Sequence, residues 1–222
     1  MPAFFITGTD TGIGKTWFIC RLLRAWRARG HAAAAVKPLS TGDRRDAELL
    51  REAGGNALSL DEINPLHFRE PAAPLIAAQA ENRVADFPAL NRHIGALRER
   101  FTHFAVEGVG GWRVPLAPGY GVREWARDLA LPVVVVARAG LGTLNHTLLT
   151  VDSIRDAGLI CAGVVLNPGP DANPAPGSAS PDLDLARRTN LLLLRDILLL
   201  PVFELYGRAE TAGEIPVWLG GE

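Results

Sequence analysis

The residues whose types and spacing most clearly indicate a chemical role lie near the N-terminus, where positions 8–16 read Gly-Thr-Asp-Thr-Gly-Ile-Gly-Lys-Thr. An apolar run, 3–6, precedes them, and residues 17–29 have the pattern of a helix. A buried strand, a glycine-bearing turn and a helix opening with Lys-Thr form a phosphate-binding loop, because the free N–H groups and the dipole of the helix start attract an anion. Lys15 adds a positive charge for the terminal phosphates, and the Thr16 hydroxyl can ligate Mg²⁺. We therefore predict a nucleotide site, against the alternative of a chance Gly-Lys-Thr at a helix start.

Three further charged residues lie at the ends of expected strands or the start of a helix. Glu107 follows an expected strand and precedes a glycine-rich loop, where it is either a ligand of the nucleotide's metal or a solvated loop glutamate. Asp46 opens an expected helix and is either a further Mg²⁺ ligand or a carboxylate that interacts with the helix dipole. Lys37, at a strand end, is either solvated or points inward, where it would add a cation over the transferred phosphate.

The elements around these residues predict an α/β fold of three layers, a mostly parallel sheet with helices on both faces, like that of P-loop nucleoside triphosphate hydrolases. Near-continuous apolar strands that alternate with helices are typical of such a sheet. We expect strands over 3–6, 32–36, 102–106, 131–137, 159–166 and 198–202. We expect helices over 17–29, 44–53, 73–80, 86–100, 121–129, from the turn at 140–146 to about 157, and over 182–196.

Three stretches give no regular pattern. Residues 37–42 and 56–70 are expected to be loops or irregular connections. Residues 168–181 are rich in Pro, Gly, Ala and Ser, so we expect a mobile loop there and not a domain boundary. The chain 1–222 is accordingly expected to form a single domain.

The composition is that of an ordinary globular protein, with 48% apolar residues, 21% charged residues and a net charge of −1. No basic field suggests a nucleic-acid partner, and no leader or membrane-length apolar run is found, so we expect a cytoplasmic protein. Cys20 and Cys161 lie in separate apolar segments and are expected to be buried free thiols. His103 and His146 share no ligand spacing that would indicate zinc, and Trp112 and Trp125 are interpreted as packing residues. Asp10 occupies the position at which ATPases that position proteins or septa carry a lysine.

The chain resembles the dethiobiotin synthetase family in an ordered series of motifs that extends to Asn167. The resemblance includes the spacing of the phosphate loop, in which five residues and not the general four separate Gly8 from Gly14. The matching segments are 8–16, Lys37-Pro38, Thr41-Gly42, Asp46-Ala47, Glu107 to Trp112, Pro115-Leu116, Gly140 to His146, Leu149-Thr150, Gly163 and Asn167.

The resemblance implies an enzyme, an ATP-dependent cyclo-ligase that acts at the penultimate step of biotin biosynthesis. Its substrates would be 7,8-diaminononanoate, CO₂ and ATP with Mg²⁺. One substrate amine forms a carbamate, ATP phosphorylates it, and the second amine attacks this carbamic–phosphoric mixed anhydride to close the ring. Because a carbamate and a triphosphate are both anionic, cations must screen their repulsion, and Lys15, Lys37 and Mg²⁺ would supply them.

The resemblance also implies roles for individual residues. The Mg²⁺ ligands would be Thr16, Asp46 and Glu107. The nucleotide would be bound by Gly12, Ile13, Gly14, Lys15, Thr16, Trp17, Asp46, Glu107, Gly108, Val109, Gly110, Asn167, Pro201, Val202 and Phe203. Catalysis would depend on Thr11, Lys15 and Lys37. The substrate would be bound by Thr11, Lys37, Thr41, Gly142, Thr143, Leu144 and Asn145. In the family the segment 142–145 belongs to the neighbouring subunit, so a homodimer with shared active sites is implied.

Two other functions remain open on the residues alone. A corrinoid amidoligase relative would need an ammonia-producing domain with a nucleophilic cysteine, and neither Cys20 nor Cys161 suits that role. A P-loop ATPase switch that binds a protein partner would use hydrolysis to change conformation and would need no pocket for a small carboxylate. The turn at 142–145 and the aspartate at position 10 weigh against the switch.

Overall fold

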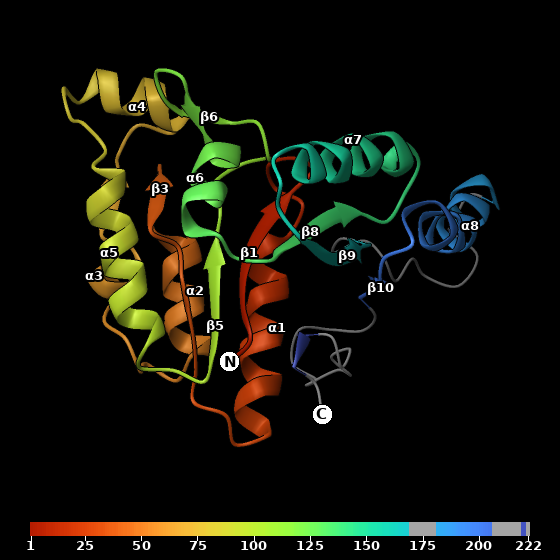
Figure 1. Cartoon of the computed structure of the whole chain (residues 1–222), viewed down its shortest axis with the longest axis horizontal. Helices are drawn as coiled ribbons and strands as arrows, with labels where there is room; N and C mark the ends of the chain where they lie inside the picture. The colour runs from red at the N-terminus through yellow and green to blue at the C-terminus, as the bar shows by residue number, and fades with distance from the viewer. Residues whose placement is uncertain (169–180, 206–218, 221–222) are drawn as a thin grey trace.

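The computed structural model of the chain describes residues 1–168, 181–205 and 219–220. Within these residues the main sheet has six parallel strands in the order β10-β9-β8-β1-β5-β2, and Figure 1 shows β5, β1, β8 and β9 following one another across it. Its strands are β1 (Ala3–Gly8), β2 (Ala33–Val36), β5 (His103–Glu107), β8 (Val133–Arg138), β9 (Cys161–Asn167) and β10 (Val202–Glu204). The expected parallel sheet is therefore confirmed.

Helices cover both faces of this sheet, as the register of the central strands demonstrates. Alternate side chains of a strand point to opposite faces. Glu107 of β5 is the register partner of Ile6 and reaches Thr16 of α1, whereas Phe5 meets Trp125 of α6 with ring centroids 5.9 Å apart. The helices are α1 (Lys15–Ala28), α2 (Arg45–Ala53), α3 (Leu60–Ile63), α4 (Pro74–Ala80), α5 (Phe87–Arg98), α6 (Val122–Leu129), α7 (Thr143–Asp156) and α8 (Pro181–Leu198). The three-layer arrangement is confirmed.

The structure corrects the two segments expected to be irregular. Residues 37–42 contain β3 (Leu39–Thr41), which pairs in parallel with β4 (Leu66–Phe68), and α3 also lies within 56–70. Strands of three residues are too short to produce a periodic pattern, and their pairing joins segments distant in sequence. Helix α3 did carry a local signal, because Ser59 and Glu62 form a capping box at its start.

Two smaller corrections concern strands. A short antiparallel pair, β6 (Pro115–Ala117) and β7 (Tyr120–Gly121), was not expected. The last described strand begins at Val202, and not at Leu198, because α8 continues to Leu198 and Leu199 then takes a positive φ of 53°. The loop expected over 168–181 lies outside the described residues except at its two ends.

The side chains interpreted as packing residues do pack. Trp112 and Trp125 are buried, and buried His103 places its ring against Trp26, with centroids 5.1 Å apart. His146 is exposed on α7. Among the residues that the structure describes, no helix is long and apolar enough to cross a bilayer.

Both cysteines are buried free thiols, as expected. Burial raises the pKa of Cys20 to about 12 and that of Cys161 to about 11. Because the thiolate is the nucleophilic form, neither side chain is suited to attack a substrate at neutral pH. The amidoligase alternative needs a nucleophilic cysteine, and neither cysteine meets that requirement.

Candidate active site

The phosphate loop, residues 8–16, leads from the carboxyl end of β1 into α1. Gly12 and Gly14 have positive φ angles of 70° and 89°, and Gly14 is the N-cap of α1. No side chain caps this helix start. The first N–H groups of α1 are therefore left to an anion, at the end of the helix where the dipole favours negative charge.

Lys15, the first residue of α1, connects this loop to the loop after β5. Its ammonium donates a hydrogen bond of 2.6 Å to the carbonyl oxygen of Gly110 and a longer one of 3.4 Å to that of Asp10. Burial lowers the pKa of Lys15, although the nearby charge of Glu107 opposes the effect. Carbonyl acceptors around a buried ammonium mark a position where phosphate oxygens could replace them.

Lys37 lies between two carboxylates, and this ion cluster is the centre of the site. Its Nζ donates to Oε1 of Glu107 at 2.8 Å and is also ion-paired with Asp46. The hydroxyl of Thr16 donates to the same Glu107 oxygen at 2.8 Å. The structure thus brings together Thr16, Lys37, Asp46 and Glu107 from α1, the end of β2, α2 and the end of β5.

The electrostatics keep Lys37 and Asp46 ionised. Burial alone would lower the pKa of Lys37, but the charges and hydrogen bonds of Glu107 and Asp46 hold it above its ordinary value. Burial would raise the pKa of Asp46, but the charge of Lys37 and its hydrogen bond lower it. Lys37 is therefore an ammonium at neutral pH although it is buried.

The donor set of this cluster fits Mg²⁺. Oε2 of Glu107 is buried and has no hydrogen-bond partner among the described residues, which leaves an acceptor facing the site. Asp46 and Thr16 add a second carboxylate and a hydroxyl. Within the described ranges no group of three or more His, Cys, Asp and Glu could hold a metal. An ion here would take its other ligands from phosphate and water, which is the way Mg²⁺ is usually bound.

Both lysines of the chain lie at this site. Among the 23 Lys and Arg residues of the sequence, only Lys15 and Lys37 are lysines, and both are buried. All the remaining Lys or Arg positions carry arginine. A compact ammonium, and not the wider guanidinium fork, therefore occupies the two positions at this site. This count is a sequence signal that could have singled out Lys37 without any structure.

The residues expected at the base end of the nucleotide lie at the end of β9 and at the start of β10. Asn167, buried at the end of β9, donates a hydrogen bond of 2.8 Å to the carbonyl oxygen of Ile13 in the phosphate loop. Pro201 precedes β10 and its carbonyl accepts a hydrogen bond from Val164, while Val202 is buried and Phe203 half-buried. Their contact with a base stays a prediction.

The expected substrate-binding residues divide into two groups. Thr11, on the phosphate loop, is exposed, and Thr41 ends β3. The turn at 142–145 begins α7, with Gly142 and Asn145 exposed, Leu144 half-buried and Thr143 buried. In the part of the chain that is described, no hydrogen bond or ion pair joins this turn to the Lys37 cluster.

One polar cluster beside the site was missed by sequence reasoning. Asn64, Ser40 and Arg44 are joined by side-chain hydrogen bonds next to Lys37. Asn64 stands before a proline in the segment expected to be irregular, so the sequence indicated only a turn there. The capping box of Ser59 marks the start of a helix, and recognising it would have indicated an ordered element just before Asn64.

A substitution at Gly14 tests the phosphate loop. A Cβ at Gly14 would lie 2.0 Å from Nδ2 of Asn167 and break its bond to Ile13, whereas a Cβ at Gly12 meets nothing within 4 Å. Both positions have a positive φ, so backbone strain is matched. We expect Gly14→Ala to weaken ATP binding in calorimetry by roughly a hundredfold, or about 3 kcal/mol, and Gly12→Ala to weaken it less. Equal losses in the two variants would contradict the packing role of Asn167.

The fold and the site together define a P-loop nucleoside-triphosphate-binding protein of the α/β class. Solved structures with the same fold include the MinD cell division protein of Aquifex aeolicus, with a TM-score of 0.51 and 13% identity over 91% of this chain and 80% of that one. The signal recognition particle receptor FtsY of Elizabethkingia anophelis has a TM-score of 0.55 and 12% identity over 98% of this chain and 63% of that one. At these identities the likeness concerns the fold alone.

Sequence relatives identify the family within this class. A family model described as an AAA domain matches residues 2–216. ATP-dependent dethiobiotin synthetase BioD of Anaeromyxobacter dehalogenans (strain 2CP-C) is 45% identical over 87% of this chain and 90% of the relative. The protein of the same name from Akkermansia muciniphila is 45% identical over 75% of this chain and 78% of the relative, and that from Bacillus velezensis is 38% identical over 75% and 74%. The chain belongs to the ATP-dependent dethiobiotin synthetase family, whose enzymes are ligases of biotin biosynthesis.

Proposed function

We propose that this chain closes the ureido ring of dethiobiotin from 7,8-diaminononanoate, CO₂ and ATP, in the cytoplasm. The observation that carries the proposal is the cluster of buried Lys37, Glu107 and Thr16 with the partly exposed Asp46 beside the phosphate loop, in a chain of this family. In this proposal the ammonium of Lys37 would lie next to the terminal phosphate. A reaction between two anions needs such a cation.

The chemistry proceeds in three balanced steps. An amine nitrogen of the substrate attacks CO₂, loses a proton and becomes a carbamate. A carbamate oxygen then attacks the γ-phosphorus of ATP, and the bond to the β-phosphate oxygen breaks to release ADP. The second amine attacks the carbonyl carbon of the mixed anhydride, phosphate leaves with the former carbamate oxygen, and the amine loses its proton as the ring closes.

The two lysines serve the middle step. Lys37 remains protonated because its carboxylate neighbours raise its pKa, so it can screen the carbamate from the triphosphate. Lys15, at the start of α1, would exchange the Gly110 carbonyl for phosphate oxygens. Thr11, exposed on the phosphate loop, would meet the carbamate end of the substrate. The charge of Lys37 is in place before substrates arrive, which lowers the reorganisation needed during the reaction.

Thr16, Asp46 and Glu107 would hold Mg²⁺, and the orphaned Oε2 of Glu107 supports this assignment. The ion would neutralise phosphate charge as the γ-phosphoryl group is transferred. The remaining nucleotide contacts would come from the phosphate loop and the strand ends, namely from Gly12, Ile13, Gly14, Trp17, Gly108, Val109, Gly110, Asn167, Pro201, Val202 and Phe203.

The test of this function is whether ATP turnover requires the diamine. The protein is incubated with ATP, Mg²⁺ and bicarbonate, and ADP release is followed with and without 7,8-diaminononanoate. We expect release to depend on the diamine. Equal release in both reactions would rule out the proposal and would favour a nucleotide-dependent switch.

We further propose a homodimer in which Gly142–Asn145 of one subunit binds the substrate carboxylate in the partner's site. No side chain caps the start of α7, so the helix start suits a carboxylate, and among the described residues this turn makes no hydrogen bond or ion pair with the Lys37 cluster of its own chain. Thr41 and Lys37 would contact the other end of the substrate.

Subunit mixing tests the shared site. Gly142→Asp places a negative charge at the carboxylate site, and its Cβ meets no neighbour within 4 Å, although the φ of 88° at this position favours glycine. Mixing inactive Lys37→Ala with inactive Gly142→Asp should restore activity to about a quarter of wild type, because each mixed dimer then has one intact site. If each site lay within one subunit, every site in the mixture would carry a defect and no activity would return.

A further inference from the structure

The backbone of Lys37 is held by Ile63, the last residue of α3, and by Asn64, the residue that follows it. The N–H of Lys37 donates to the carbonyl oxygen of Ile63 at 3.0 Å, and its carbonyl oxygen accepts a hydrogen bond of 2.7 Å from Nδ2 of Asn64. The side chain of Lys37 therefore projects into the ion cluster from a residue whose N–H and carbonyl are both held by hydrogen bonds. A shift of this backbone would move the ammonium.

The amide of Asn64 also joins the segments that carry two other site residues. Its Oδ1 accepts hydrogen bonds of 3.0 Å from the Ser40 hydroxyl and of 3.0 Å from Nε of Arg44. Ser40 precedes Thr41 on β3, and Arg44 is the N-cap of α2, which carries Asp46 in its first turn. Because a guanidinium can only donate, Arg44 fixes which end of the amide faces the Lys37 carbonyl.

We propose that Asn64 is a positioning residue for the phosphoryl-transfer step, which sets the ammonium of Lys37 relative to Asp46 and Thr41. The inference rests on the function proposed above. Asn64 is 2% exposed, so both ends of its amide need partners within the protein. Only an amide supplies a donor for the Lys37 carbonyl and an acceptor for Ser40 and Arg44. An aspartate would direct a carboxylate at that carbonyl, and a leucine would leave all three groups unpaired.

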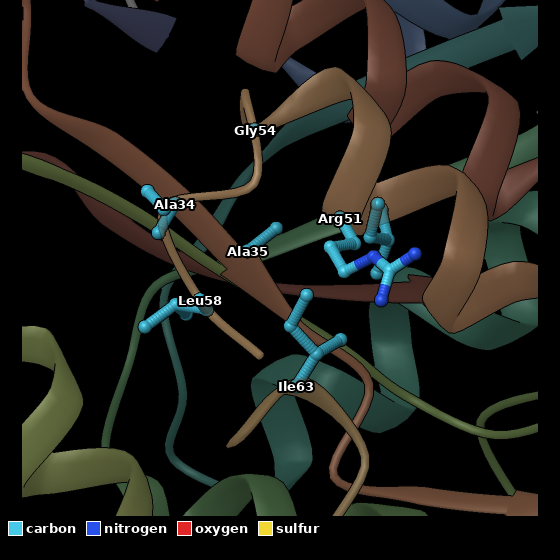
Figure 2. A pocket seen from close by; sticks show the side chains of 8 residues that line it. Ala34, Ala35, Arg51, Gly54, Leu58 and Ile63 are labelled. Carbon is cyan, nitrogen blue, oxygen red and sulfur yellow. The ribbon is translucent and has the colours of Figure 1, made fainter. Parts of the chain in front are cut away.

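The surrounding contacts indicate that the segment stays in place without this amide. Ile63 lines a small pocket of about 10 Å³ together with Ala34 and Ala35 of β2 (Figure 2). The β3–β4 pairing continues from Leu66, and the capping box of Ser59 fixes the start of α3. Loss of the amide should therefore alter the placement of Lys37 more than the fold.

The experiment compares Asn64→Asp with Asn56→Asp, the same chemical change at an exposed position of the same segment. We measure kcat and KM for the diamine and for ATP, together with Tm. Asn64→Asp is expected to lower kcat by roughly a hundredfold with the KM for ATP within about threefold of wild type, because misplacement of a catalytic group acts on the reacting geometry. Asn56→Asp should behave like wild type. A wild-type kcat in Asn64→Asp would overturn the proposal.

A double-mutant cycle separates positioning from general damage. If Asn64 acts through Lys37, Asn64→Asp should cost much less kcat in a Lys37→Arg background than in wild type. An equal loss in both backgrounds would overturn the proposal. Should Asn64→Asp fail to fold, the double variant Ser40→Ala, Arg44→Met, which frees the amide to rotate, must show the kcat loss, and wild-type kcat there would overturn it.

The two proposals fail in different ways. If wild-type turnover is independent of the diamine, the proposed function fails. If wild-type turnover requires the diamine and Asn64→Asp retains it fully, only the positioning role fails.

Discussion

Replacing Lys37 by alanine should lower kcat for diamine-dependent turnover by roughly a thousand-fold, because it removes the fixed cation between the carbamate and the triphosphate. The substitution also leaves the buried carboxylate of Glu107 and the partly exposed carboxylate of Asp46 without their shared counter-charge. The measurement is steady-state turnover at saturating ATP and diamine. Full activity of Lys37→Ala would show that this lysine takes no part in the chemistry.

Two controls make the result specific. Tm and ATP affinity show whether Lys37→Ala is folded and retains the phosphate loop. Lys37→Arg keeps the positive charge but replaces a compact ammonium by a wider fork, so we expect activity well below that of wild type. Wild-type activity of Lys37→Arg would show that charge alone suffices at this position.

Glu107→Gln should have the second-largest effect, a loss of kcat on the order of a hundredfold or more. Oε1 of Glu107 accepts hydrogen bonds from both Thr16 and Lys37, and its orphaned Oε2 is the acceptor that we assign to Mg²⁺. The amide is nearly isosteric but uncharged, so it weakens the ion pair and the metal site together.

Thermal shift with nucleotide distinguishes the metal role of Glu107 from its role beside Lys37. In wild type, Mg²⁺ should add to the stabilisation by ATP, since a ligand that binds only the folded state raises Tm. In Glu107→Gln this addition should be lost. Glu99→Gln, an exposed change at the end of α5, is the matched control and should respond to Mg²⁺ like wild type. A full Mg²⁺ response in Glu107→Gln would contradict its assignment as a metal ligand.

The parts of the site that depend on local sequence could be predicted. The phosphate loop consists of a strand end, a glycine turn and a helix start, and these three elements are contiguous in the sequence. Glu107 could be found because the end of an apolar strand marks the edge of the sheet where sites lie. The inward direction of Lys37 could not be deduced in this way, because it depends on Asp46 and Glu107, which come from other elements.

The parts that depend on pairing between distant segments could not be predicted. Strands β3 and β4 have three residues each, and they exist because their backbones pair across the intervening α2 and α3. Asn64 acquires its role only when this pairing brings it beside the Lys37 carbonyl. A buried asparagine before a proline has no pattern of its own, so its partners had to be seen in the structure.

The central claim is that the chain joins CO₂ to a diamine at the expense of ATP. The most direct measurement supplies ¹³C-bicarbonate, ATP, Mg²⁺ and 7,8-diaminononanoate to the wild-type protein and quantifies ADP and dethiobiotin by mass spectrometry. The account predicts that dethiobiotin carries a single ¹³C in its ureido carbonyl and forms in equal amount with ADP. ADP release that continues without the diamine, with no labelled cyclic urea, would contradict it.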